Sequence, residues 1–206
     1  MLKKSLSIAL VLALLSVTAF ADKGQKKGNK QNSSKQQKKG KQNRQNRGQV
    51  ENLETTIQSN ELTADQKEGL IFMIEEEKLA RDVYAALYDT WGTRVFTNIT
   101  KSEQKHMDAV ENLLNKYELE IPTTLSNIGV FEDSHLQEMY DDLIAKGNSS
   151  LIDALEVGVI IEEVDIADLQ ELIEAGVPND IEEVYTNLLN ASYKHLRAFN
   201  RQLSRQ

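Results

Sequence analysis

Ser102-Glu103-Gln104-Lys105-His106 lies inside a run with strong helical periodicity. Residues three apart on an α-helix point from the same face, so the carboxylate of Glu103 and the imidazole of His106 can reach one metal ion. Such a pair is common in helices, and on an exposed face it would be an ordinary solvated pair. Its meaning therefore depends on whether this face is buried and whether other helices bring acids to the same depth.

Five segments have the apolar spacing and end signals of α-helices. The first is predicted from Ala64 to Trp91, with a Thr cap before it and Gly92 after it. The others are predicted at about 98–117, 134–146, 151–175 and from 179 toward the C-terminus, the last capped by Asn179 or Asp180. No run alternates convincingly at period two. We therefore predict an all-α fold, a four-helix bundle with the short 134–146 helix in the connection between its second and third long helices.

Polar residues interrupt the apolar stripe of each long helix. They are Glu77 in the first helix, Glu103 and His106 in the second, Glu162 with Asp165 beside it in the third, and Ser192 and His195 in the fourth. An unpaired buried carboxylate is costly, so one acid per helix at similar depth requires positive charge between them. A pair of divalent cations supplies that charge in carboxylate-bridged di-iron and di-manganese bundles. We predict such a site, with Glu77, Glu103, His106, Glu162 and His195 as ligands.

A metal-free core is the alternative interpretation. The buried acids would then pair with Lys78, Arg81, Lys105 or Arg197, and His195 would be a satisfied core histidine. Tyr84 is predicted as a packed core residue, with a hydrogen bond to the site as its alternative role. His135, on the short helix, is predicted at the surface.

Four sequence blocks resemble a known family. Residues 77–84, Glu-Lys-Leu-Ala-Arg-Asp-Val-Tyr, are similar to the first-helix ligand segment of rubrerythrins, and 103–106 match the second-helix motif. Together with 75–84, 102–106, 161–169 and 195–199, they resemble the bacterial family catalogued as domain of unknown function 2202 (DUF2202), over about residues 60–203. The resemblance implies the ferritin-like superfamily and a rubrerythrin-like metal-binding bundle.

The chain departs from this pattern on the last helix. The Glu of the second Glu-x-x-His would fall at Ser192, whose neutral hydroxyl is a poor bridging ligand. Asp165, one turn after Glu162, or Glu163 would have to replace that carboxylate. Otherwise the site holds one ion instead of two, iron or manganese in either case.

The first 50 residues have a different character from the rest. Residues 1–21 combine Lys3 and Lys4, an apolar run and Ala19-Phe20-Ala21, which predicts a signal peptide cleaved after Ala21 and an exported protein, periplasmic or extracellular. An uncleaved anchor is the alternative, but the run is shorter than the ~20 residues of a membrane span. The chain has no cysteine, which excludes disulfides, iron–sulfur clusters, thiolate zinc sites and cysteine nucleophiles.

Residues 22–50 hold ten Lys or Arg against one acid, whereas 51–206 hold twelve against thirty-one. The basic stretch has almost no apolar residues, so we expect a disordered tail before a bundle domain at 51–206. A plain solvated linker is one role for it, and a contact with anionic lipid, with wall polymer or with the acidic domain is another. Nucleic acid is not expected as a partner, because no aromatic residue in the tail could stack on bases.

Three functions are compatible with these patterns. The first is an oxidoreductase with a dinuclear site that oxidises ferrous iron or reduces peroxide or dioxygen. The second is a metal buffer of the cell envelope without turnover, and the third is an interaction module that uses the basic tail. The sequence leaves the oligomeric state open.

Overall fold

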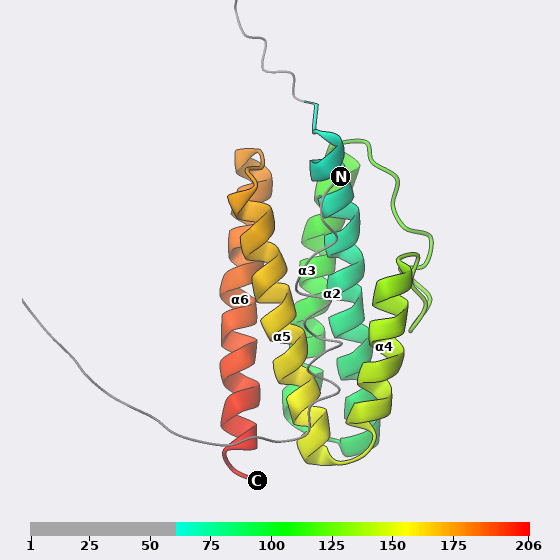
Figure 1. The fold of residues 1–206 in the computed structure, drawn as a ribbon, viewed down its shortest axis with the longest axis vertical. Coiled ribbons are helices and arrows are strands. Elements are labelled where there is room, and N and C mark those ends of the chain that lie inside the picture. The colour runs from blue at the N-terminus through cyan, green and yellow to red at the C-terminus, as the bar shows by residue number, and fades with distance from the viewer. Residues whose placement is uncertain (1–60) are drawn as a thin grey trace, which may run out of the picture. The chain divides into compact units, whose positions relative to one another are not determined.

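The computed structural model describes residues 61–206, which form five α-helices and no strand (Figure 1). The helices are α2 (Ala64–Trp91), α3 (Arg94–Lys116), α4 (Ser134–Gly147), α5 (Leu151–Glu174) and α6 (Asn179–Leu203). The all-α prediction is confirmed for this part of the chain. The predicted signal peptide at 1–21, the tail at 22–50 and the first residues of the 51–206 domain lie outside the described residues.

Local capping explains where most helices begin and end. The Thr63 hydroxyl accepts from the backbone N–H of Gln66 while the Gln66 side chain accepts from the N–H of Thr63, a reciprocal capping box. Gly92 ends α2 with a φ of 62°, a left-handed conformation that favours glycine. Ser150 caps α5 by accepting from the N–H of Asp153. The sequence predicted all three ends.

Two helix starts differ from the predictions. α3 begins at Arg94, four residues early, because Val95 and Phe96 are buried in the core and extend its apolar face. The residue that caps α6 is Pro178, and no side chain bonds the free N–H groups there. The cap predicted at Asn179 or Asp180 is therefore wrong. The Asp180 carboxylate accepts instead from Lys116 Nζ at 2.8 Å and from the Tyr117 hydroxyl at 2.8 Å.

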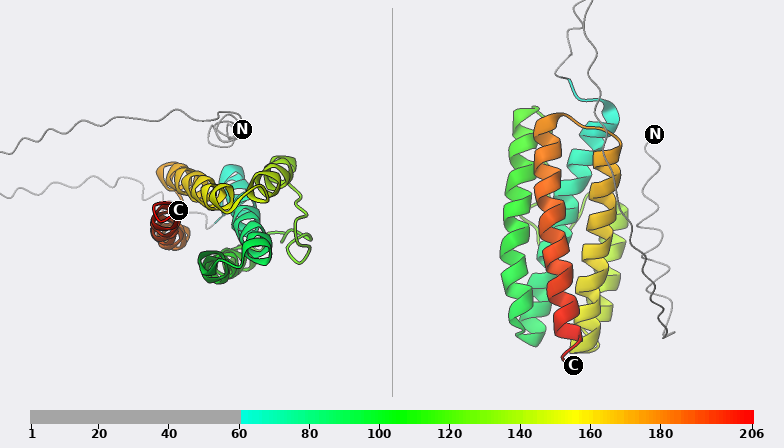
Figure 2. Two further views of the ribbon diagram at one scale, coloured as in Figure 1. Left: turned by 90° about the horizontal axis from the view of Figure 1, so that it is seen from below. Right: turned by 90° about the vertical axis from the view of Figure 1, so that its left-hand side faces the viewer.

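The four long helices pack around a common core, each beside two antiparallel neighbours (Figure 2). α2 contacts α3 and α5, and α6 contacts the same two helices. Since α3 and α5 run in the same direction, the chain between them must return along the bundle, and residues 117–150 do so (Figure 1). Within this connection, where the short extra helix was predicted, α4 packs on α2 and α5.

Buried acids hold the connection against α2. The Glu75 carboxylate accepts from the backbone N–H groups of Glu132 and Asp133 at 2.7 and 2.9 Å. Asp82 accepts from the N–H of Gly129 at 3.0 Å and from Lys78 Nζ at 2.7 Å. These carboxylates are satisfied by structural partners and are not available for a ligand.

The core consists of two apolar clusters with a polar layer between them. One cluster lies around Val83, Phe96, Leu155 and Phe199, and the other around Ile74, Val110, Leu169 and Leu188. Between them lie the acids Glu77, Glu103, Glu162 and Asp165 with His106 and His195, which together form the polar layer. No helix among residues 61–206 is both long and apolar enough to cross a bilayer.

Candidate metal centre

Glu103 lies at the centre of the polar layer and is shared by two groups of potential ligands. Its Oε2 lies 2.7 Å from Nδ1 of His106, and its Oε1 lies 3.0 Å from Nδ1 of His195, on the opposite helix α6. Glu77 joins the first group, with Oε2 3.1 Å from Nδ1 of His106. Glu162 joins the second, with Oε2 3.5 Å from Nδ1 of His195. All four helices thus contribute to two adjoining groups.

Each group is compact enough to surround one ion. The donor atoms of Glu77, Glu103 and His106 lie within 4.8 Å of one another, and so do those of Glu103, Glu162 and His195. The two histidine rings are stacked, with centroids 5.7 Å apart and an interplanar angle of 23°. The structure therefore brings together all five residues predicted as principal ligands, and Glu103 is common to both groups.

Several potential ligand atoms in these groups and in the nearby Asp165 make no hydrogen bond. They are Oε1 of Glu77, Oε1 of Glu103, Oδ1 of Asp165 and Nδ1 of His195. The 3.0 Å contact between Glu103 and His195 is thus close without being aligned as a hydrogen bond. Buried polar atoms normally find partners, so these unpaired atoms fit a layer that is arranged around a cation.

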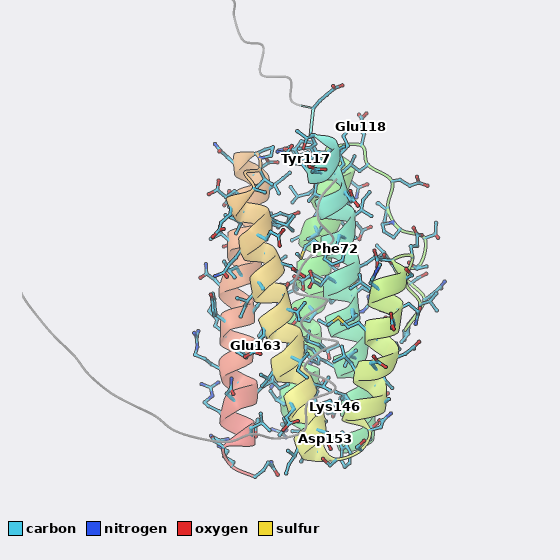
Figure 3. All side chains as sticks on the ribbon, viewed as in Figure 1. Phe72, Tyr117, Glu118, Lys146, Asp153 and Glu163 are labelled. Carbon is cyan, nitrogen blue, oxygen red and sulfur yellow. The ribbon has the colours of Figure 1, made fainter. Side chains whose placement is uncertain are left out.

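Asp165 lies next to Ser192, the position where the family resemblance predicts a glutamate. It is buried on α5, and its Oδ2 accepts the hydroxyl proton of the buried Ser192 on α6. Glu163, the other candidate replacement, is exposed on the outside of α5 (Figure 3). Asp165 and not Glu163 therefore places a carboxylate beside Ser192, because residues two positions apart on a helix point about 200° apart.

Tyr84 combines both roles that the sequence allowed. Its ring is fully buried and packs on Phe199 and Phe96, with centroid distances of 5.2 and 6.3 Å. Its hydroxyl donates to Oε1 of Glu162 at 2.7 Å. This hydrogen bond leaves Oε2 of Glu162 toward His195 and fixes the orientation of the carboxylate.

Burial and crowding shift the acids of the layer toward their protonated forms. Burial raises the pKa of Glu77 to about 7, although His106 opposes the shift. Burial also raises the pKa of Glu162 to about 7. The pKa of Asp165 lies well above its usual value because of burial and the nearby charges of Glu77 and Glu162. Without a cation, the layer holds protons that a metal would displace.

Glu103 is the exception among these acids. Burial would raise its pKa, but the contacts with His106 and His195 prevail and lower it to about 2. Burial likewise disfavours the charged histidines, yet the surrounding carboxylates raise the pKa of His106 to about 11 and that of His195 to about 10. The central carboxylate is therefore ionised between two positively charged neighbours.

Lysine and arginine do not neutralise this layer within residues 61–206. Lys78 and Arg81 both pair with Asp82, at 2.7 Å each, toward the connection. Lys105 and Arg197 are exposed. Among the described residues, the buried acids of the polar layer are therefore not paired with Lys78, Arg81, Lys105 or Arg197, as the metal-free alternative predicted. His135 is 43% exposed, as predicted.

The sequence patterns missed two acids in the layer. Glu76 is buried on α2 beside Glu77, and Asp168 is buried on α5, one turn beyond Asp165. A signal for them existed: Glu75, Glu76 and Glu77 follow one another in an apolar context, and Glu162, Asp165 and Asp168 recur at intervals of three, which keeps them near one face.

Comparisons with known proteins identify a family and a relative of this chain. A family model described as "Uncharacterized protein domain (DUF2202)" matches residues 66–206. Uncharacterized protein MJ0754 of Methanocaldococcus jannaschii is 47% identical over 150 residues, which cover 73% of this chain and 81% of that protein.

Two solved structures are similar to this fold. The crystal structure of hypothetical protein MJ0754 has a TM-score of 0.70 and 48% identity, and the match covers 71% of this chain and 84% of that one. A crystal structure of a DUF305 fragment from Deinococcus radiodurans has a TM-score of 0.53 at 12% identity, over 71% of this chain and 99% of the fragment, which is a likeness of fold alone. The match over residues 66–206 and the near-half identity to MJ0754 show that this chain belongs to the DUF2202 family.

Proposed function

We propose that this protein is a ferritin-like four-helix bundle that binds two divalent metal ions, iron or manganese, in its polar layer. The observation that carries the proposal is Glu103, whose two carboxylate oxygens face two histidines in two separate ligand groups. A carboxylate shared in this way is the bridging element of dinuclear bundle sites.

The donor set suits these metals. Carboxylate oxygen and imidazole nitrogen are ligands of iron and manganese, and the lack of cysteine removes thiolate competition for softer ions. Glu77 and His106 would hold one ion, Glu162 and His195 would hold the other, and Glu103 would bridge them. Asp165 would supply the carboxylate that Ser192 does not.

If the protein turns over a substrate, we propose that ferrous iron is oxidised while dioxygen or peroxide is reduced. A bound metal pair would supply the redox chemistry when present. The protein's own part would be to orient the ligands, through the Tyr84 hydroxyl on Glu162, and to keep bulk water out by burial.

A metal buffer without turnover is the second candidate. What favours it is the depth of the ligands: Glu77, Glu103 and Glu162 are each 2% exposed, which suits retention of an ion more than rapid exchange. We further propose export through residues 1–21 and contact of residues 22–50 with an anionic envelope surface. N-terminal sequencing of envelope-extracted protein should begin at Asp22, and deletion of 22–50 should weaken binding to anionic vesicles.

Metal counting on the full chain tests the leading proposal. After reconstitution with Fe²⁺ or Mn²⁺, the wild-type polar layer should hold two ions, Glu77→Gln should cost one of them and Glu103→Gln should cost both. Glu163→Gln, an exposed change on the same bundle, is the matched control and should keep the wild-type count. No near-stoichiometric iron or manganese in the reconstituted protein would contradict both metal hypotheses.

Kinetic measurements distinguish the oxidoreductase from the metal buffer without turnover. Accelerated Fe²⁺ oxidation or peroxide consumption, lost in His106→Ala and kept in a 22–50 deletion, would support the oxidoreductase. Stoichiometric metal with no acceleration over free Fe²⁺ would favour the buffer.

A further inference from the structure

Ser102 lies one helical turn before His106 on α3 and is not one of the predicted ligands. Its Oγ lies 3.4 Å from Nε2 of His106. Ser102 is half-buried, so its hydroxyl lies at the edge of the polar layer. The imidazole of His106 is therefore contacted at both ring nitrogens, by carboxylates at Nδ1 and by a hydroxyl at Nε2.

His106 turns its Nδ1 atom toward two carboxylates. Oε2 of Glu103 lies 2.7 Å from this nitrogen, and Oε2 of Glu77 lies 3.1 Å from it. Nδ1 would lose its proton when a cation binds between these acids, because a ligating nitrogen needs its lone pair. The remaining proton of the neutral imidazole then belongs to Nε2.

A proton on Nε2 of His106 needs an acceptor, and the structure places the Ser102 hydroxyl there. A serine oxygen has two lone pairs that can accept a hydrogen bond. Histidines that bind metal commonly donate their second N–H to such a partner, which fixes the tautomer and the orientation of the ring. The position of Ser102 matches this role.

The histidine on the opposite helix lacks the equivalent hydroxyl. His195 on α6 also turns Nδ1 toward Glu103, at 3.0 Å, and its ring stacks on that of His106. The residue one turn before His195 is Ala191, whose side chain is a methyl group. The two histidines therefore share a carboxylate but differ in the side chain that precedes them by one turn.

We propose that Ser102 is a positioning residue of the metal centre, whose hydroxyl accepts from the Nε2–H of His106 and so presents Nδ1 to the ion held with Glu77 and Glu103. This inference rests on the proposed metal-binding function and adds to it a residue that is not itself a ligand. Ser102 would act on the ion of the His106 group, and the ion of the His195 group would keep its affinity.

Stepwise Mn²⁺ affinities of the full chain, measured by competition with a chelator of known affinity, test this role. Ser102→Ala should keep two ions per chain and bind one of them about 10-fold more weakly, the usual cost of losing such a partner. Ser102→Thr retains the hydroxyl and should restore the wild-type affinity. Thr100→Ala is the matched control, because it removes an α3 hydroxyl that bonds the carbonyl of Phe96 instead.

Exchange of the imidazole proton gives a second measurement, which a change in packing alone would not alter. In the Co²⁺-loaded protein, the Nε2–H proton of His106 should give a shifted resonance that is absent in His106→Gln. This proton should exchange with solvent faster in Ser102→Ala than in the wild type or in Thr100→Ala. Unchanged thermal midpoints of the metal-free variants, measured by circular dichroism, would show that the fold is kept.

Three results would overturn the role of Ser102. Two ions bound with equal affinity by the wild type and by Ser102→Ala would do so and leave the dinuclear centre standing. Weaker binding that Ser102→Thr does not restore, with unchanged proton exchange, would assign the effect to packing. A wild-type chain that binds no ion would contradict the proposed function and this inference together.

Discussion

The Ser192 hydroxyl on α6 donates a hydrogen bond to the Asp165 carboxylate on α5, and both side chains are buried. The contact places a carboxylate from α5 beside the position on α6 where the family resemblance predicts a glutamate. In the proposed metal centre, the Ser192 hydroxyl would orient this acid from the neighbouring helix.

We expect Asp165→Asn to weaken metal binding more than Ser192→Ala does. The first change removes a carboxylate, whereas the second removes only its hydrogen-bond donor, a loss typically worth about 10- to 100-fold in metal affinity. Competition with a chelator of known affinity would measure both. Equal affinities in wild type and Asp165→Asn would show that Asp165 is not a ligand.

Tyr84→Phe should keep the packing on Phe199 and remove the hydrogen bond to Glu162. Since a buried acceptor is left unsatisfied, we expect a loss of about 1–3 kcal/mol in the free energy of unfolding of the metal-free protein, measured in urea. Tyr193→Phe is the control, because the Tyr193 hydroxyl receives its hydrogen bond from the exposed Gln170. A similar small change in both variants would mean that the Tyr84 hydroxyl does not position the ligand.

The metal-free protein should lose stability as the pH rises from about 4.5 to about 7. Glu77 and Glu162 have a pKa of about 7 when folded, above their ordinary value of 4.5, so their protonated forms favour folding and this contribution disappears through that window. The histidines, with folded pKa values of about 11 and 10, lose their contribution only at higher pH, and Glu103, lowered to about 2, loses its contribution only in acid.

Bound metal should reverse this loss of stability with rising pH. Because ligands must lose their protons to bind, the difference in thermal midpoint between metal-loaded and metal-free protein should widen from pH 5 to pH 7.5. Differential scanning calorimetry at several pH values would measure both forms. A metal-free midpoint that rises steadily to pH 7.5 would contradict the assigned shifts.

Gly158→Ala should destabilise the bundle next to the centre. A Cβ at this position would lie 2.5 Å from the Phe199 ring, which is fully buried and packs on Tyr84. We expect a loss of about 1–3 kcal/mol from overpacking, only partly offset by the ~1 kcal/mol helix preference of alanine. Gly69→Ala is the matched control: its Cβ would meet the flexible end of Leu172 at 2.8 Å, so thermal unfolding should show a smaller loss.

The sequence determined the features that depend on neighbours along the chain. The Thr63 cap, the left-handed Gly92 and the Ser150 cap set helix ends through bonds within a few residues, so their signals are visible in the order of amino acids. The interruptions of the apolar stripes likewise indicated that Glu77, Glu103, Glu162 and His106 would be buried, although they did not indicate Glu76 or Asp168. The missing cap at Asn179 shows the limit of such rules, since Asp180 is used by Lys116 and Tyr117 from α3.

Only the tertiary structure decided how the buried groups face one another. Helix rotation differs by about 100° between adjacent residues, so packing against the other helices decides that Glu77 meets His106 and that Asp165 and not Glu163 reaches Ser192. The sharing of Glu103 between His106 and His195 also depends on the distance between α3 and α6. Such relationships arise from side-chain packing across the core, which a pattern along one helix does not contain.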